Sequence, residues 1–250
     1  MPKLLFVIGL TTLLALGACG GSKDPFETKD GGGASGGTAP ALNATVKGKI
    51  AFEGTPPEMK KIVTSSDPGC KNSDLANEAI IVSDGGLENV IVYVSKGLEG
   101  KKFPKPTEQK VLDQKGCHYV PHALTLQTGQ ELKIVNSDET THNIHAWAEV
   151  NSPFNESQSS KGVETVKTFD KEEVLLPVRC DVHNWMNAFI GVFTNPSNAV
   201  SGKGGAYEFK LPAGEYEITA EHEKLGKQTQ MVTVAENGTA DVNFTFKAAN

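Results

Sequence analysis

Alternation of apolar and polar residues is the feature that most limits the fold of this chain. Short segments with this period of two recur along the sequence, and Gly, Pro or Asn residues bound them. The segments include 46–52, 124–126, 132–134, 207–211, 216–220 and 242–246. A period of two places successive side chains on opposite faces of an extended strand. Because no long stretch has a helical period, the sequence predicts an all-β protein built from antiparallel sandwiches.

The N-terminal residues have the pattern of an export signal. One lysine precedes an apolar run from Leu4 to Leu16, which is too short to span a bilayer permanently. The run ends in Leu-Gly-Ala-Cys, which resembles a bacterial lipobox, so 1–18 is predicted to be a lipoprotein signal peptide and Cys19 the lipidated residue. The alternative is ordinary secretory cleavage near Ala18, which leaves Cys19 as a free thiol. Residues 19–43 are rich in Gly and Ser, and we expect a flexible linker.

These features predict a location and exclude one class of partner. A lipidated Cys19 would tether the chain to a membrane without crossing it, on the periplasmic or cell-surface side. The residue after the cysteine is Gly20 and not an Asp. By resemblance to enterobacterial sorting, this favours the outer membrane. The formal charge is −6 and no Lys/Arg cluster stands out. Nucleic acid is therefore not an expected partner.

The strand-like segments divide into a central unit and two flanks. Residues 107–196 form the central unit. In the flanks, the Leu-Pro-Ala-Gly-Glu-Tyr turn at 211–216 lies between two alternating segments and resembles carboxypeptidase-regulatory-like domains. This resemblance implies a small β-sandwich made of residues 44–106 and 197–250, with the central unit inserted into it. The alternative is two domains in series, with a boundary near 196.

The cysteine count leaves one thiol unpaired. There are four cysteines, and with Cys19 assigned to lipid an odd number remains in an oxidising compartment. Cys70 and Cys117 both lie in turn-like surroundings, Asp-Pro-Gly-Cys and Gln-Lys-Gly-Cys, and we predict a disulfide between them. Cys180 is then the free cysteine.

The free cysteine belongs to a motif of metal-binding residue types. The stretch RCDVHNWM places Cys180, His183 and Met186 at spacings of three, and His142 followed by Asn143 lies upstream. Together these residues resemble the cupredoxin family of Greek-key sandwiches, which hold one copper ion for electron transfer. The resemblance implies His142, Cys180 and His183 as a trigonal copper set, with Met186 as a weak axial ligand. A thiolate, two imidazoles and a thioether also form a soft donor set that suits Cu(I) and Cu(II).

Two neighbours of the first histidine need their own interpretation. The cupredoxin resemblance implies that Asn143 ties the two ligand-bearing segments together and sends its backbone N–H to the thiolate. His145 is the candidate for an alternative or additional ligand. In an extended strand His142, Ile144 and Ala146 share one face, and the apolar company of His142 predicts that it, rather than His145, points inward.

The spacing of three between His183 and Met186 departs from single-copper electron carriers. It matches the binuclear copper centre of cytochrome oxidase, but that centre needs a second loop cysteine, and this loop has none. We expect Trp185 to shield the metal or to pack. His118 and His122 are expected to be surface or packing residues, and His222 a solvated one.

The function predicted from these residues is electron transfer by a membrane-tethered copper protein, without enzymatic activity. A redox protein such as a c-type cytochrome or a membrane oxidoreductase is the expected partner. The alternative is a copper-binding or delivery protein without redox turnover. The H-x-H plus H-C-H pattern of multicopper oxidases is not found in the sequence, and a structural zinc site would rarely use Met.

Overall fold

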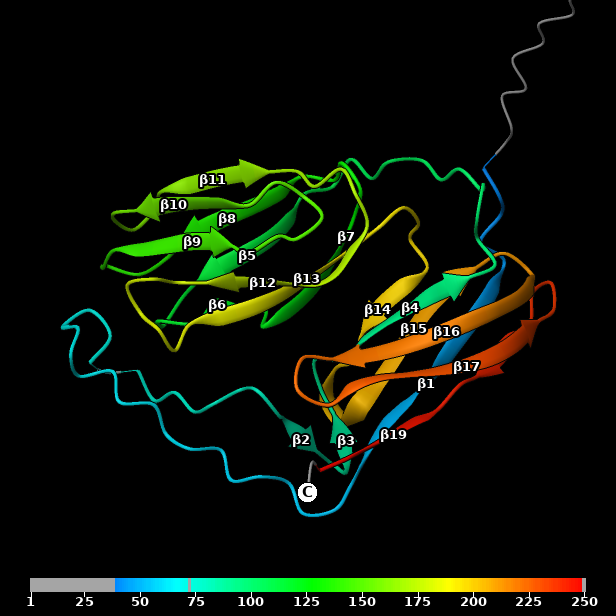
Figure 1. The fold of residues 1–250 in the computed structure, drawn as a ribbon, viewed down its shortest axis with the longest axis horizontal. Helices are drawn as coiled ribbons and strands as arrows, with labels where there is room; N and C mark the ends of the chain where they lie inside the picture. Colours follow the sequence, from blue (N-terminus) through cyan, green and yellow to red (C-terminus); the bar gives the residue numbers. More distant parts are fainter. Residues whose placement is uncertain (1–38, 72, 249–250) are drawn as a thin grey trace, which may run out of the picture. The chain divides into compact units, whose positions relative to one another are not determined.

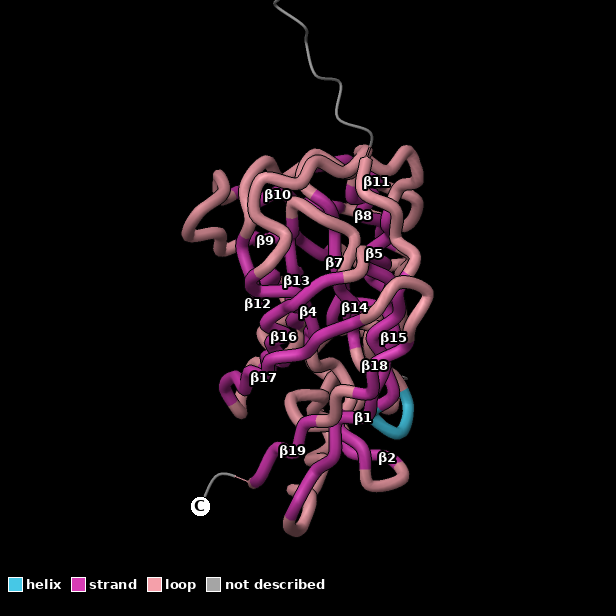
Figure 2. Tube along the Cα trace, turned by 90° about the vertical axis from the view of Figure 1, so that its right-hand side faces the viewer, coloured by secondary structure: helices cyan, strands magenta, loops and turns pink. Residues whose placement is uncertain are grey.

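The computed structural model describes residues 39–71 and 73–248. The predicted signal peptide, Cys19 and the linker up to residue 38 lie outside these residues. The described part consists of strands and loops, with one short helical turn, η1 (Lys203–Gly205), which is the cyan segment in Figure 2. This confirms the predicted all-β class. No helix in the described residues has the length and apolarity needed to cross a membrane.

The strands of the central unit run from β5 to β13 and form two sheets, drawn in green to yellow in Figure 1. One sheet has the order β10-β9-β12-β13-β7, and the other has the order β11-β8-β5-β6. The bounds are β5 (Lys110–Gln114), β6 (Tyr119–Val120), β7 (Ala123–Gln127), β8 (Leu132–Asn136), β9 (His142–Ala146), β10 (Phe154–Gln158), β11 (Glu164–Lys167), β12 (Glu173–Arg179) and β13 (Asn187–Phe193).

The core of the central unit follows from the alternation in these strands. In β8, Leu132 and Ile134 are buried while Lys133 and Val135 are only partly buried. Ile144, Leu176 and Ile190 join them from the other sheet, all fully buried. Cys180 and Met186 belong to the same apolar cluster. The sandwich thus carries its soft donor atoms inside its own hydrophobic core.

The flanking strands form a second pair of sheets with a separate core. The six-stranded sheet has the path β15-β1-β3-β2, and β18 and β19 also pair with β1; the four-stranded sheet has the order β14-β4-β16-β17. The bounds are β1 (Ala44–Glu53), β2 (Val82–Ser83), β3 (Gly86–Leu87), β4 (Ile91–Lys96), β14 (Asn198–Val200), β15 (Ala206–Leu211), β16 (Gly214–His222), β17 (Gly226–Val234), β18 (Thr239–Asp241) and β19 (Phe244–Lys247).

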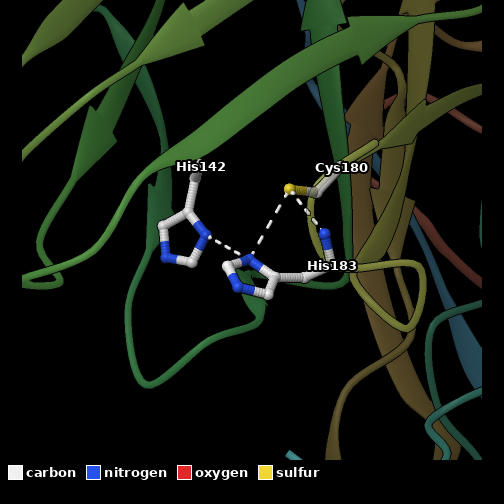
Figure 3. A group of neighbouring side chains, drawn as sticks. All are labelled: His142, Cys180 and His183. Atoms are coloured by element: carbon white, nitrogen blue, oxygen red, sulfur yellow. Dashed lines mark hydrogen bonds between the residues drawn. The ribbon is translucent and has the colours of Figure 1, made fainter. Parts of the chain in front are cut away.

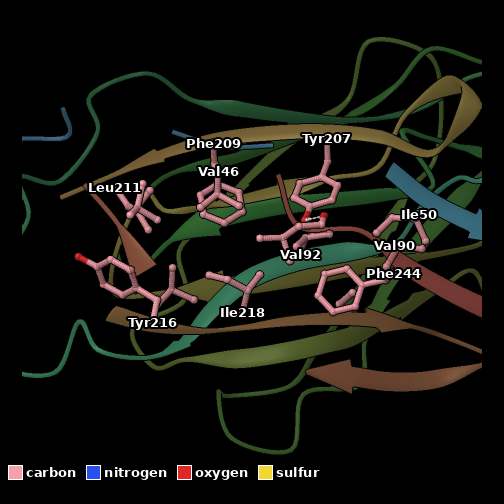
Figure 4. Packing of buried hydrophobic residues seen from close by; sticks show 14 of the residues in the cluster. Val46, Ile50, Val90, Val92, Tyr207, Phe209, Leu211, Tyr216, Ile218 and Phe244 are labelled. Carbon is pink, nitrogen blue, oxygen red and sulfur yellow. Dashed lines mark hydrogen bonds between the residues drawn. The ribbon is translucent and has the colours of Figure 1, made fainter. Parts of the chain in front are cut away.

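Aromatic and aliphatic side chains from both flanking sheets pack between them (Figure 4). The buried hydroxyl of Tyr207 donates a hydrogen bond to the carbonyl of Val242 at 2.5 Å, and that of Tyr216 donates to the carbonyl of Pro212 at 2.9 Å. Gly48 lets β1 approach this region closely, since a Cβ there would lie 1.8 Å from the Val242 oxygen. The polar groups of this core are thus satisfied within it.

Residues 54–81, called here the bridging segment, connect β1 to β2. Apart from one isolated bridge between Lys61 and Ala76, the described residues of this segment (54–71 and 73–81) are turns and irregular structure. A disulfide joins Cys70 of this segment to Cys117 of the central unit, with 5.7 Å between the Cα atoms, and Cys180 is a free, buried cysteine. The predicted disulfide is confirmed. The predicted boundaries assigned 54–81 to the flanking sandwich, and the disulfide attaches it to the central unit.

The expectation that His222 is solvated is wrong. Its side chain is 2% exposed. The charged neighbours in Ala-Glu-His-Glu-Lys suggested a surface position, but His222 continues the inward face of β16 that Tyr216, Ile218 and Ala220 begin. Strand alternation therefore outweighs local composition at this position.

Candidate metal centre

Three side chains with metal-binding atoms meet at one end of the central core. His142 is the first residue of β9, Cys180 directly follows β12, and His183 lies in the loop between β12 and β13. One donor atom from each lies within 4.8 Å of the others, and all three residues are buried. Figure 3 shows the two imidazole rings with one nitrogen of each facing the other, and the Cys180 sulfur beside the His183 ring. The antiparallel pairing of β9 with β12 brings these segments, about forty residues apart, together.

The distances within this group are short. Nδ1 of His142 lies 3.0 Å from Nδ1 of His183. The Cys180 sulfur lies 3.8 Å from Nδ1 of His183 and accepts a hydrogen bond from the His183 backbone N–H at 3.4 Å. Both imidazoles thus present the same nitrogen, Nδ1, to one common point beside a sulfur.

Backbone hydrogen bonds hold the loop that carries Cys180 and His183. The N–H of Cys180 donates to the carbonyl of Met186 at 3.2 Å, and the N–H of Met186 donates to the carbonyl of His183 at 2.9 Å. Asn143 connects the loop to β9, because its side-chain oxygen accepts the N–H of Asp181 at 2.5 Å and that of Val182 at 3.3 Å. The loop is therefore fixed at both ends.

Met186 is 1% exposed and lies in the same apolar cluster as Cys180. It directly precedes β13, so the strand fixes its backbone. The structure therefore places all four predicted ligands in the buried end of the central unit, and the role of the thioether as an axial donor remains a prediction.

Asp138 fixes the orientation of the His142 ring by a hydrogen bond to the nitrogen that faces away from His183. Its Oδ2 accepts a hydrogen bond from Nε2 of His142 at 3.0 Å. The same carboxylate accepts the backbone N–H groups of Gly116 and Cys117 at 2.7 and 2.8 Å. A proton on Nε2 leaves the Nδ1 lone pair of His142 free for a metal.

Asp67 does the same for His183 from the bridging segment. Its Oδ2 accepts a hydrogen bond from Nε2 of His183 at 2.8 Å and one from the Thr140 hydroxyl at 2.9 Å. Gly69 allows this approach, because a Cβ there would lie 2.6 Å from Cβ of Thr140. His183 is 2% exposed as a result. Sequence reasoning missed Asp67, although the Asp-Pro-Gly sequence is a turn signal that presents an Asp side chain.

The pKa values reflect these contacts. Burial raises the pKa of the Cys180 thiol, but hydrogen bonds from His142 and from the backbone N–H groups of Asn143, His183 and Val182 outweigh it, and the net pKa is lowered. Burial lowers the pKa of His142, but the Asp138 carboxylate and Cys180 outweigh it and raise that pKa to about 9. Each shift favours the charged form of its group. Metal binding must displace the additional proton of His142, so affinity should rise with pH.

The donor set fits copper. Two other groupings, Asp67 with Cys70 and His183, and Cys117 with Asp138 and His142, contain disulfide sulfurs, which are not thiolates. The thiolate of Cys180 and the two Nδ1 atoms remain. Two imidazoles and one thiolate with a neighbouring methionine form the donor combination of mononuclear copper sites.

His145 lies outside this group. Its side chain is 26% exposed, and its Nδ1 contacts the carboxylate of Asp181 at 3.0 Å. The ring packs on Trp147, with 4.6 Å between centroids. The buried positions of His142, Ile144 and Ala146 and the outward position of His145 follow the alternation of β9, although Asn143 is also buried by its bonds to the loop.

Trp185 covers one side of the site. Its ring lies against His183, with 5.0 Å between centroids, and its indole N–H donates to the carbonyl of Cys117 at 3.0 Å. The Cys70 sulfur lies 3.7 Å from Nε2 of His183. The disulfide and the indole together separate His183 from solvent.

No protein-family model matches the chain, and no curated protein matches it. Among solved structures it is similar to a copper-containing nitrite reductase from Thermus scotoductus, at 21% identity over 38% of this chain and 24% of that chain, with a TM-score of 0.33. It is also similar to an oxidized amicyanin variant, at 16% identity over 46% and 92% of the two chains with a TM-score of 0.31.

A third similarity is to a purple cupredoxin from Nitrosopumilus maritimus, at 20% identity over 33% of this chain and 98% of that chain, with a TM-score of 0.29. The chain spans about a quarter of the length of the nitrite reductase. At these TM-scores the similarities carry no inference about the site, whose chemistry rests on its own residues.

Proposed function

We propose that this chain is a mononuclear copper protein of the cupredoxin class that carries electrons. The observation that supports it is the meeting of one thiol and two imidazole nitrogens in a buried group within 4.8 Å. A bound copper ion would supply a one-electron Cu(I)/Cu(II) couple held by His142, Cys180 and His183, with Met186 as the fourth donor.

The residues around the donors favour electron transfer over ligand exchange. Asp138 and Asp67 fix the outer nitrogens of the two histidines, and Asn143 fixes the loop that carries Cys180. Burial excludes water from the donor atoms. A site held in this way before metal binding needs little rearrangement when the charge of the ion changes.

The cellular setting of this proposal rests on the sequence. A lipidated Cys19 and the linker to residue 43 would hold the copper domain at a membrane, on the periplasmic or cell-surface side, with the outer membrane favoured by Gly20. The partner would be a redox protein such as a c-type cytochrome or a membrane oxidoreductase. The flanking sandwich, which resembles carboxypeptidase-regulatory-like domains, would serve as a scaffold or docking module.

Reconstitution with Cu(II) tests the proposal. The purified chain should bind one copper and show an intense sulfur-to-copper absorption band, with a matching paramagnetic resonance spectrum. Cys180→Ser should abolish the band and leave the far-ultraviolet circular dichroism unchanged. A band that survives Cys180→Ser would refute the site. Copper that binds but cannot be reduced and reoxidised without loss would replace electron transfer with copper binding or delivery.

A further inference from the structure

A second group of ionisable side chains lies around His122, between β6 and β7. The side chain of His122 is 6% exposed, and its Nε2 lies 2.7 Å from Oε1 of Glu223, whose side chain is 5% exposed. A carboxylate accepts hydrogen bonds and does not donate them, so Nε2 of His122 carries a proton. Glu223 thereby fixes both the tautomer and the orientation of the ring.

The opposite nitrogen of this ring has no hydrogen-bond partner. Nδ1 of His122 is buried and unpaired, and the nearest charged atom is Oε2 of Glu78, at 3.7 Å. In a neutral ring with Nε2 protonated, Nδ1 presents a lone pair. Two acceptors, a buried imidazole nitrogen and the oxygen of a partly exposed carboxylate, therefore face each other. A cation between them would relieve this arrangement.

The space next to these atoms can hold such a cation. A pocket of about 190 Å³ is lined by both His122 and Glu78. His118 also lines this pocket. Lys224 pairs with Glu223, with its Nζ 3.6 Å from a Glu223 oxygen, and among the described residues Glu78 has no lysine or arginine partner.

We infer that this pocket is a second metal site, which binds a divalent ion of the Zn²⁺ or Cu²⁺ type through Nδ1 of His122 and the carboxylate of Glu78. Metal-binding histidines typically donate their other N–H to a carboxylate, and Glu223 provides that contact here. Imidazole and carboxylate donors suit Zn²⁺ and Cu²⁺. Glu223 is a positioning residue in this arrangement.

This site is separate from the proposed copper centre and differs from it in chemistry. It contains no cysteine, so a metal bound there would not give an intense sulfur-to-copper band. Trp185 lies between the two places, since its ring packs on His183 and also lines the pocket. Binding at this pocket goes beyond the proposed function and does not depend on it.

Zinc titration of the full chain tests the inference. The native protein is first loaded with one equivalent of Cu(II), and Zn²⁺ is then titrated by calorimetry, with the bound metals counted by mass spectrometry. One further equivalent of zinc should bind. His122→Gln should weaken this binding at least tenfold, and Glu78→Gln should also weaken it. Glu58→Gln, an exposed glutamate of the same segment, is the matched control and should bind zinc as the native chain does.

The design separates this inference from the copper proposal. The same zinc titration is repeated with Cys180→Ser and with Cys180→Ser combined with His122→Gln. The double variant should bind zinc more weakly than the single one. This comparison does not depend on the copper assignment, because both chains lack the thiolate. Glu78, whose side chain is 32% exposed, carries the test if His122→Gln does not fold. Failure of the copper-loaded chain to bind one equivalent of zinc, or equal zinc binding by the native chain and by Glu78→Gln, would overturn the inference.

Discussion

Two buried histidines, one in each sandwich, have opposite acid–base properties. His142 in the central unit is fully buried, and its pKa is raised to about 9. His222 in the flanking sandwich is equally buried, and its pKa is lowered to about 4. Burial lowers both values, because it penalises the charged form. Only His142 has a carboxylate and a thiol close enough to reverse the effect.

The difference shows how the two cores treat polar groups. In the flanking core, the hydroxyls of Tyr207 and Tyr216 end on backbone carbonyls, and Nδ1 of His222 accepts the N–H of Lys224. In the central core, the polar atoms of His142, Cys180 and His183 face one another. Burial by itself therefore does not mark a functional histidine. The marker is buried donor atoms that point at each other while carboxylates hold their outer edges.

The largest expected effect comes from replacing the inward histidine of β9, with the outward histidine of the same strand as the control. His142→Ala should abolish the intense copper band, because it removes one of three donors. His145→Ala is the matched control on the same strand, and it should leave the band unchanged because its ring bonds to Asp181 and is partly exposed. Absorption spectra of the two copper-loaded variants decide the matter. The reverse pattern would show that β9 presents the other face to the site.

Removing the disulfide should destabilise the central unit more than the flanking one. Cys70→Ser with Cys117→Ser opens a covalent loop with a sequence separation of 47, which corresponds to a loss of about 4 kcal/mol in the free energy of unfolding. Both tryptophans of the chain, Trp147 and Trp185, lie in the central unit, so their fluorescence in urea reports on it. An unchanged midpoint of the fluorescence transition would contradict this prediction.

The flanking histidine should make stability depend on pH. The pKa of His222 is about 4 in the folded chain and about 6.5 when unfolded, so between these values the unfolded state binds more protons. His222 therefore leaves the free energy of unfolding unchanged above pH 6.5. As the pH drops to 4, protonation of His222 in the unfolded state lowers that free energy by about 3 kcal/mol.

The measurement is urea unfolding from pH 7 to 4, for the native chain and for His222→Gln. In the variant, the free energy of unfolding should fall less steeply with decreasing pH, because the contribution of His222 is missing. The carboxylates contribute equally in both proteins. Parallel curves would mean that His222 titrates alike in the folded and unfolded chains.

The smallest effect is expected at the carboxylate on His183. Asp67→Asn should weaken copper binding about tenfold to hundredfold, because a loss of this hydrogen-bond partner changes the orientation and basicity of a metal ligand. The reduction potential should rise, since the negative charge favours Cu(II). Asp74→Asn is the control in the same segment, where the carboxylate pairs with Lys61 on an exposed surface. Equal affinities and potentials for both variants would remove Asp67 from the site.

Much of the centre was predictable because its residues are close in sequence or obey strand alternation. Cys180, His183 and Met186 lie within seven residues, so their types and spacing were visible directly. Alternation predicted the inward direction of His142. The odd cysteine count indicated that one thiol is free, and the turn-like surroundings of Cys70 and Cys117 suggested that it is Cys180. Asp67 was not found, because it contacts a residue 116 positions away through a segment without periodicity.

The sequence by itself determined the all-β class and the residue types of the candidate donors, because period and residue type are local properties. Only the tertiary structure decided the electrostatics of each histidine. Whether a buried imidazole meets Asp138, Glu223 or only apolar neighbours depends on which distant loops pack against it. The free energy of a charge in a protein interior depends on those contacts, and local sequence does not specify them.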